Sequence, residues 1–178
     1  MGRKAKSELL DETPPNDVEL EKRVIGMMLV FPESVKTMRS QLVPSQFHDC
    51  RARWFYQAIL EAGADVSLVV NWAREHGGMD KFRELDGPAY LAEAMYEHGL
   101  STLAPYYIRI LRDHATRRNV IKLATRMLQA AYSMEIPVEE LLERCHKAVE
   151  WTRTRHGQMS FTPNNNEEKS SVDKPKRS

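Results

Sequence analysis

The spacing of apolar residues along the chain predicts α-helices in nearly every segment. In the stretch PPNDVELEKRVIGMML, residues 14–29, the side chains of Leu20, Val24, Met27 and Met28 recur three or four positions apart. This interval is the period of one helix face. The same period continues in most of the segments that follow. The pattern therefore predicts an all-α protein in which each helix buries one face.

The start and the middle of this first helix carry further signals. Pro14 and Pro15 favour an extended approach. Asn16 is expected to cap the helix, with Glu19 three positions later as in a capping box. Gly26 lies among the bulkiest apolar residues, although glycine costs about 1 kcal/mol relative to alanine inside a helix. We therefore expect another helix to approach closely at Gly26.

A second helix is predicted after Pro32, with Val35, Met38 and Leu42 on one face. Three more are predicted before residue 100, in the sequences CRARWFYQAILEAG, VSLVVNWAREH and AYLAEAMYE. Asp49 and Asp65 precede the first two and are expected N-caps, and Gly63 is a good C-terminal stop. The run SLVV alone would suit a strand, but its neighbours favour a helix. We expect residues 14–100 to form one compact helical head.

A longer pair of helices is predicted after residue 100. The first extends to about residue 133, and its apolar row is Leu103, Tyr107, Ile110, Ile121, Ala124, Leu128 and Ala131, interrupted by His114 and Arg117. The second begins at Pro137, with Val138, Leu141, Leu142, Cys145, Ala148 and Val149 on one side. Because so few residues separate the two helices, residues 101–156 are expected to form an antiparallel hairpin.

Composition is that of a folded globular chain with a charged surface. Hydrophobic residues make up 42% of the 178 residues and charged residues 29%, and the formal net charge is +1. No overall field therefore favours nucleic acid or membranes. Residues 1–13 are polar and expected to be flexible. Residues 157–178 contain too few apolar side chains to offset the entropy of ordering, which predicts a disordered polar tail.

Signals for membranes and secretion are missing from the sequence. The apolar runs are far shorter than the roughly 20 residues of a spanning helix. The basic N-terminus is not followed by the apolar region of a secretory signal. Cys50 and Cys145 lie far apart and suggest no disulfide framework. These features predict a cytoplasmic protein without a membrane partner.

Motifs for catalysis are missing as well. The sequence has no G-x-x-x-x-G-K-[ST] loop for a nucleotide phosphate, no glycine-rich dinucleotide motif after a strand, and no G-x-S-x-G turn. His48 with Cys50, and Cys145 with His146, lack the paired spacing of a zinc site. His76 suits a helix end better than the role of a general base. We therefore expect no catalytic, cofactor-binding or metal-binding residues.

The predicted long helix carries a concentration of positive charge. Residues 102–133 contain six basic residues against one acidic residue, Asp113. The basic residues are Arg109, Arg112, Arg117, Arg118, Lys122 and Arg126. They suggest contact with a nucleic-acid backbone or with an acidic partner. Pairing with acidic residues of the second hairpin helix, such as Glu139 and Glu143, is the commoner fate of such charges and is the interpretation that we favour.

The hairpin also carries more apolar residues than one inward row requires. Val120, Leu123, Met127 and Tyr132 lie off the main row and would be exposed on an isolated hairpin. Exposed apolar patches usually mark interaction sites, and a hairpin from a second copy would bury this one. The residues expected at this self-association or partner surface are Val120, Leu123, Met127, Leu128, Tyr132, Leu142 and Val149.

Taken in order, these segments resemble the N-terminal domain of DnaB-type replicative DNA helicases. The first segment shares Pro14-Pro15, an acidic helix start and Gly26 within an apolar run. RARWFYQAIL resembles the family's third helix, and GPAYLAEAM resembles its Gly-Gly-x-x-Tyr-Leu segment. The long basic helix is similar to a Tyr-Ala-x-x-Val-x-x-x-x-x-x-Arg stretch, with Arg117 or Arg118 at the arginine position. ELLERCHKAVEW resembles the closing helix.

The resemblance implies an all-helical, non-catalytic domain with the DnaB N-terminal-domain fold. In that family the domain pairs through its hairpins and forms a collar of dimers on a six-membered helicase ring. It also docks a DnaG-type primase and affects loading of the ring. One departure is local, because the family's Gly-Gly pair is Asp86-Gly87 here. A larger departure is that the family's ATP-hydrolysing motor domain is missing from this sequence.

Two hypotheses follow for the function. The first is a replication module without ATPase activity of its own. It would self-associate and bind primase, a full-length DnaB-type helicase or a helicase loader, in a bacterial, phage or plasmid setting. The second is a DNA-binding regulator that acts through the basic face of residues 102–133. The polar tail does not resemble the family's linker helix, which favours a free-standing relative over a truncated helicase.

Overall fold

The structure is a computed structural model that describes residues 12–133 and 135–158. Every regular element in these ranges is helical, which confirms the all-α prediction. The α-helices are α2 (Val18–Val30), α3 (Ser34–Gln41), α4 (Cys50–Ala62), α5 (Val66–Glu75), α6 (Met79–Glu84), α7 (Gly87–Tyr96), α8 (Ala104–Ser133) and α9 (Val138–Gln158). Two 3₁₀ turns are η1 (Pro44–Gln46) and η2 (Ser101–Leu103).

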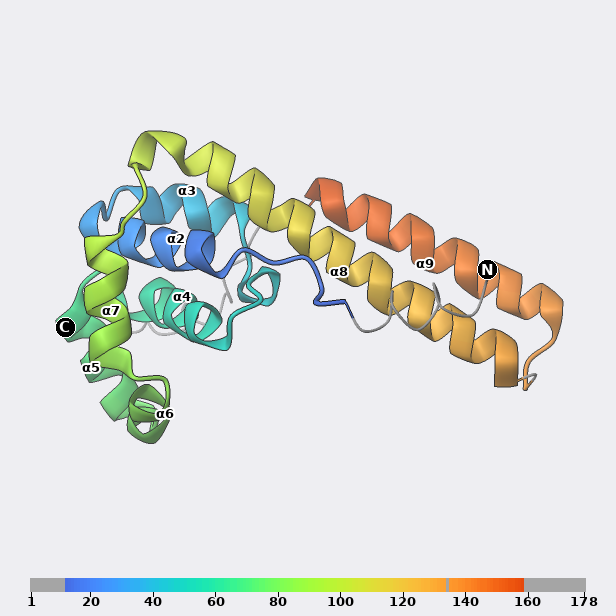
Figure 1. The fold of residues 1–178 in the computed structure, drawn as a ribbon, viewed down its shortest axis with the longest axis horizontal. Helices are drawn as coiled ribbons and strands as arrows, with labels where there is room; N and C mark the ends of the chain where they lie inside the picture. Colours follow the sequence, from blue (N-terminus) through green and yellow to red (C-terminus); the bar gives the residue numbers. More distant parts are fainter. Residues whose placement is uncertain (1–11, 134, 159–178) are drawn as a thin grey trace, which may run out of the picture.

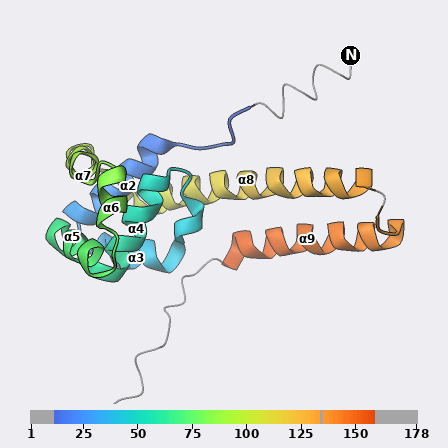
Figure 2. The ribbon, with the colours of Figure 1, turned by 90° about the horizontal axis from the view of Figure 1, so that it is seen from below.

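Helices α2 to α7 cluster into a head at one end of an elongated molecule, and α8 and α9 project from it (Figure 1). α8 crosses the head before it leaves, and α9 returns beside it in the antiparallel direction (Figure 2). The predicted head and hairpin are therefore confirmed. The predicted flexible N-terminus (1–13) and polar tail (157–178) lie outside the described residues, apart from residues 12–13 and 157–158.

Helices α2 and α7 pack so closely that their backbones nearly touch at Gly26. A Cβ atom at this position would lie 1.7 Å from the carbonyl oxygen of Ala94. The neighbouring side chains of Met27 and Met28 are completely buried. The close approach predicted at Gly26 is confirmed, and the approaching helix is α7.

Two helices of the head have the caps that the sequence predicts. Asp49 accepts a hydrogen bond from the Arg51 N–H at the start of α4, and Asp65 accepts from the Ser67 N–H at the start of α5. Gly63 ends α4 with a φ of +113°, a conformation that favours glycine. The run SLVV lies within α5, so the preference for a helix over a strand is confirmed.

At α2 the predicted cap is wrong by one residue. The N-cap is Asp17, whose Oδ1 accepts a hydrogen bond from the Leu20 N–H at 2.9 Å. Asn16 instead donates its side-chain N–H to the Pro14 carbonyl at 2.8 Å. Asn16 and Asp17 are both good caps by type, and helix boundaries are uncertain by about a residue from sequence alone.

Between α5 and α7 the structure contains a helix that the apolar spacing did not predict. α6 has only six residues, too few for a helical period to emerge. After it, Asp86 adopts a left-handed φ of +52°, where the resembling family has the first glycine of its Gly-Gly pair. Gly87 is retained for space, because a Cβ atom there would lie 2.5 Å from the Phe82 ring.

Helix α8 belongs to both the head and the hairpin. Its buried residues all lie in its first half: Ala104, Tyr107, Ile108, Leu111, Ala115 and Arg118. The boundary expected at residue 101 therefore does not separate the core from the hairpin. The single apolar row predicted for this helix is correct at Tyr107, which is buried, but the rest of the row in this half is offset from the buried face. Leu103 of that row is exposed and Ile110 is only half-buried.

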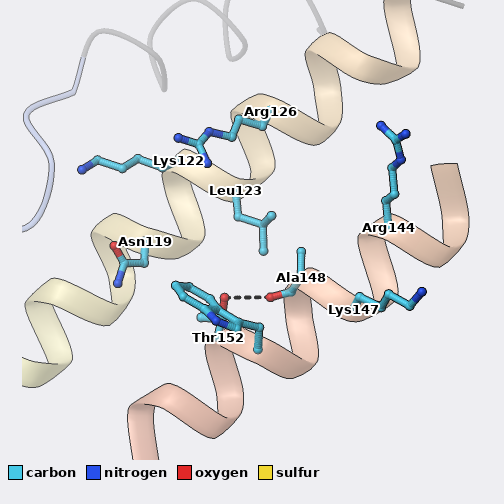
Figure 3. A pocket seen from close by; sticks show the side chains of 9 residues that line it. Asn119, Lys122, Leu123, Arg126, Arg144, Lys147, Ala148 and Thr152 are labelled. Carbon is cyan, nitrogen blue, oxygen red and sulfur yellow. Dashed lines mark hydrogen bonds between the residues drawn. The ribbon is translucent and has the colours of Figure 1, made fainter. Parts of the chain in front are cut away.

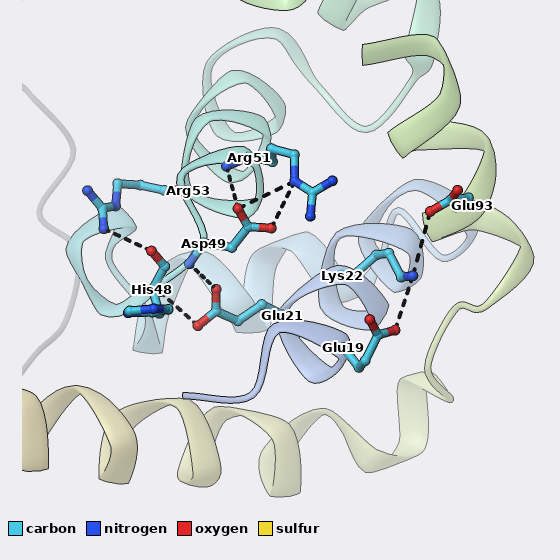
Figure 4. Close-up of polar contacts among 8 residues, drawn as sticks. All are labelled: Glu19, Glu21, Lys22, His48, Asp49, Arg51, Arg53 and Glu93. Carbon is cyan, nitrogen blue, oxygen red and sulfur yellow. Dashed lines mark hydrogen bonds and ion pairs between the residues drawn. The ribbon is translucent and has the colours of Figure 1, made fainter. Parts of the chain in front are cut away.

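A buried carboxylate joins α2 to the start of α4 (Figure 4). Glu21 is only 1% exposed. Its two carboxylate oxygens accept hydrogen bonds from the backbone N–H groups of His48 at 2.7 Å and of Asp49 at 2.8 Å. This contact holds the loop after η1 against α2, close to where α8 crosses the head.

Candidate interaction surface

Side chains of the types that can bind metals or take part in catalysis are scattered over the described residues. No three His, Cys, Asp or Glu side chains within residues 12–133 and 135–158 lie close enough together to hold a metal ion. Cys50 is exposed in the head, and Cys145 lies half-buried in the hairpin. His76 follows α5, where its ring stacks on Trp72. None of the described helices is long and apolar enough to span a membrane.

Large apolar side chains remain exposed on both hairpin helices. On α8, Val120, Leu128 and Tyr132 are 50%, 39% and 70% exposed, and on α9 Leu142 and Val149 are 63% and 52% exposed. Side chains of this kind are costly to leave in water, by about 1.5 kcal/mol or more each. Five of the seven residues predicted for the self-association surface are therefore open to solvent.

The other two predicted surface residues lie differently. Leu123 and Met127 are half-buried, and Leu123 points toward Ala148 of α9 (Figure 3). The expectation that both would be exposed is wrong, because their face of α8 turns toward α9. Conversely, Ile121 and Val138, which the sequence assigned to the inward rows, are 44% and 64% exposed.

The exposed apolar residues form one face of the hairpin. At 3.6 residues per turn, Val120 and Leu128 lie on the same side of α8, and Leu142 and Val149 lie on the same side of α9. We call these four residues the apolar hairpin face. Tyr132, one turn beyond Leu128, extends it toward the tip of the hairpin.

Arg118 does not belong to an exposed basic face. It is only 8% exposed, and its guanidinium donates hydrogen bonds to the backbone carbonyls of Pro15 and Gln46. A guanidinium held in this way cannot reach a nucleic acid, so the prediction for Arg118 is wrong. Sequence could not distinguish it from Arg117, which lies about 100° further round the helix and is exposed.

The remaining basic residues of α8 differ in their surroundings. Arg117, Lys122 and Arg126 are exposed, and Arg112 is half-buried. Arg109 is exposed and lies over the Tyr106 ring at 5.5 Å, a distance typical of a cation–π contact. Four of the six residues predicted to contact nucleic acid are therefore exposed. Of the other two, Arg112 is partly covered and Arg118 is buried.

For Arg117, Lys122 and Arg126, the favoured pairing with α9 is not observed among the described residues. In the part of the chain that the structure describes, Arg117, Lys122 and Arg126 make no ion pair. The ion pairs of α9 lie within that helix, at the i,i+3 and i,i+4 spacing that brings side chains together. They are Glu140–Arg144, Glu143–Lys147 and Glu150–Arg153.

A second group of exposed apolar residues was not predicted from the sequence. It lies where α7 leads into α8, and comprises Tyr96, at 88% exposure, with Leu100, Leu103 and Tyr106. One signal was available in the adjacent pair Tyr106 and Tyr107. Neighbouring side chains point about 100° apart on a helix, and here Tyr107 is buried whereas Tyr106 is exposed.

Head and hairpin together define the class of this protein as an all-α domain with a projecting helical hairpin. The chain belongs to a known family of this class. Its residues 13–113 match the family described as "DnaB-like helicase N terminal domain". The resemblance drawn from the sequence is therefore confirmed.

The chain is similar to replicative helicases over part of their length. It is 27% identical over 156 residues to the replicative DNA helicase DnaC of Bacillus subtilis. The aligned region covers 86% of this chain and 34% of that protein. It is 28% identical over 155 residues to the replicative DNA helicase DnaB of Geobacillus stearothermophilus. That aligned region covers 84% of this chain and 34% of that protein. The chain thus spans about a third of the length of these relatives.

A solved structure shows the same fold. The crystal structure of the N-terminal domain of DnaB helicase from Mycobacterium tuberculosis matches with a TM-score of 0.67. The match covers 78% of this chain and 99% of that chain at 24% sequence identity. The similarity therefore lies in the N-terminal domain.

Proposed function

We propose that this chain is a module of the DNA replication machinery that acts by binding proteins rather than by catalysis. Membership of the helicase N-terminal domain family supports a place in replication, in the bacterial cytoplasm or in a phage or plasmid setting. By this proposal the chain self-associates through its hairpin. It binds a DnaG-type primase, a full-length DnaB-type helicase or a helicase loader.

The observation that carries this proposal is the apolar hairpin face. Val120 and Leu128 of α8, with Leu142 and Val149 of α9, lie open to water on a hairpin only two helices thick. A second copy that presents the same face, related by a twofold axis, would cover all four residues in an isologous contact. Burial of aliphatic side chains on both copies favours such a dimer, offset by the cost of association.

The experiment is a direct binding assay with purified proteins from the organism that encodes the chain. The immobilised chain is presented to replicative helicase, primase and loader in turn, and binding is followed by biolayer interferometry. The proposal predicts saturable binding to at least one of the three. A chain that is folded by circular dichroism and binds none of them would contradict it.

The DNA-binding regulator remains the second hypothesis, on the basic face of α8. The exposure of Arg117 and Lys122 supports it, and the burial of Arg118 weakens it. It predicts DNA affinity that falls steeply with salt and is lost when Arg112, Arg117 and Lys122 are all replaced by alanine. Fluorescence anisotropy with labelled duplex and single-stranded DNA measures this, and an unchanged affinity in the triple variant removes the idea.

A further inference from the structure

A groove of about 510 Å³ runs between α8 and α9 (Figure 3). Leu123 of α8 and Ala148 of α9 point toward each other across it (Figure 3). Trp151, which is 55% exposed, also lines the groove. These three side chains give the groove an apolar floor, and the polar side chains of Asn119 and Thr152 also line it.

Basic side chains stand on both sides of this floor. Lys122 and Arg126 line the groove from α8, and Arg144 and Lys147 line it from α9 (Figure 3). On each helix the two charges are one turn apart. Among the described residues, no acidic side chain lines the groove. The groove therefore has an apolar floor between two positive rims.

The charges on the two rims are not equally available. Arg144 and Lys147 each pair with a glutamate of their own helix. Lys122 and Arg126 make no ion pair within the part of the chain that the structure describes, and both are exposed. The α8 rim therefore offers two positive charges to a ligand with no internal pair to break.

The groove and the apolar hairpin face lie on opposite sides of the hairpin. On α8, Lys122 and Arg126 are on one side of the inward-pointing Leu123, whereas Val120 and Leu128 are on the other. A ligand in the groove would therefore leave the apolar hairpin face free. Binding in the groove and self-association do not compete.

We propose that this groove binds an acidic amphipathic helix of a partner protein. A third helix laid along the groove would bury its apolar stripe on Leu123, Ala148 and Trp151. Its acidic flanks, at i,i+3 and i,i+4 spacing, would meet the one-turn spacing of the basic rims on both sides. This inference rests on the proposed function, because it assumes that the chain binds proteins. It adds which surface binds and what chemistry the partner has.

Single-stranded nucleic acid fits the groove less well. Proteins that bind it combine a basic track with several aromatic faces on which successive bases stack. The groove offers one aromatic side chain, Trp151, and its charges flank an apolar floor instead of lining it. An apolar stripe with charged edges is the complement of an amphipathic helix.

The test uses synthetic peptides of about five helical turns, made of leucine, glutamate and alanine and labelled with fluorescein. The probe has leucine along one face and glutamate on both flanks. One comparison peptide has the same composition in scrambled order, and a second has lysine in place of glutamate. A labelled oligothymidine of similar length represents single-stranded nucleic acid. Affinities are measured by fluorescence anisotropy at one salt concentration.

Two double variants locate the binding site. Lys122→Glu/Arg126→Glu reverses the α8 rim, and Arg109→Glu/Arg117→Glu makes the same charge change on the same helix outside the groove. All four side chains are exposed, so both variants are expected to fold, which thermal unfolding checks. The Trp151 indole signal in a ¹⁵N–¹H spectrum, assigned with Trp151→Phe, reports binding in the groove directly.

The proposal predicts that the acidic amphipathic peptide binds and shifts the Trp151 signal. It also predicts that scrambling the order, exchanging glutamate for lysine, or reversing the α8 rim weakens binding by about tenfold or more. The Arg109→Glu/Arg117→Glu variant should bind nearly as the wild type does.

No binding of the probe, equal binding of the scrambled peptide, or equal loss in both variants would overturn the proposal. Preferential binding of oligothymidine would overturn it in favour of nucleic acid. Self-association, measured separately by mass, is unaffected by any of these outcomes.

Discussion

At Glu21, burial and hydrogen bonding act against each other. Burial raises the pKa of this carboxyl above its ordinary value of 4.5, while the backbone N–H groups of His48 and Asp49 and the nearby charge of Arg118 oppose the rise. Because the folded pKa is the higher one, the folded state binds the proton more readily than the unfolded state does. The free energy of unfolding contributed by Glu21 is therefore present at low pH and is lost as pH rises through the folded pKa.

The Glu21→Gln variant tests this balance. Its side chain does not titrate, so the wild type should lose stability relative to the variant between about pH 4 and about pH 7. Urea unfolding at both pH values measures the difference. Glu139→Gln, the same change at an exposed site, should show no such trend. A wild type that gains stability over Glu21→Gln as pH rises would mean that the two hydrogen bonds outweigh burial.

Gly26 is the residue at which a single methyl group should do the most damage to the head. In Gly26→Ala the new Cβ would meet the Ala94 carbonyl of α7, so the two helices must move apart. We expect a loss of about 3 kcal/mol in the free energy of unfolding. Gly78→Ala is the control, since a Cβ there lies 3.4 Å from its nearest neighbours and should cost less than about 1 kcal/mol. Similar losses in the two variants would contradict the close packing of α2 and α7.

At the scale of the element, α8 changes its role along its length. Up to Arg118 it is a helix of the head, and beyond Arg118 its residues are half-buried or exposed. Helical period and turn signals were sufficient to predict the helix and its partner after Pro137. They could not predict which face is buried, because that depends on the angle at which α8 crosses the head. Arg117 and Arg118 could therefore not be told apart.

The double variant Leu128→Glu/Leu142→Glu tests the apolar hairpin face. Both side chains are exposed in the isolated chain, so thermal unfolding of the monomer should change little. Four glutamates in a twofold interface would repel one another, so self-association should be lost. Size-exclusion chromatography measures this. Tyr96→Glu/Leu100→Glu, at the exposed corner of the head, is the matched control and should associate like the wild type. Loss in the control alone would move the interface to the head.

At the scale of the whole molecule, the outline of head and hairpin could be predicted from the sequence, because it depends on local signals. Asp49, Asp65 and Gly63 mark helix ends through their own backbone preferences. The groove could not be predicted in this way. It depends on the register of the hairpin, which sets Leu123 opposite Ala148, and register is a property of two helices together. The buried contact of Glu21 with the loop before α4 is equally non-local.

The central claim is that the hairpin face joins two copies of this chain. Sedimentation equilibrium of the wild type over a range up to tens of micromolar tests it most directly. The account predicts a mass that rises with concentration to at least twice the monomer mass. A wild type that remains strictly monomeric over the whole range would contradict it.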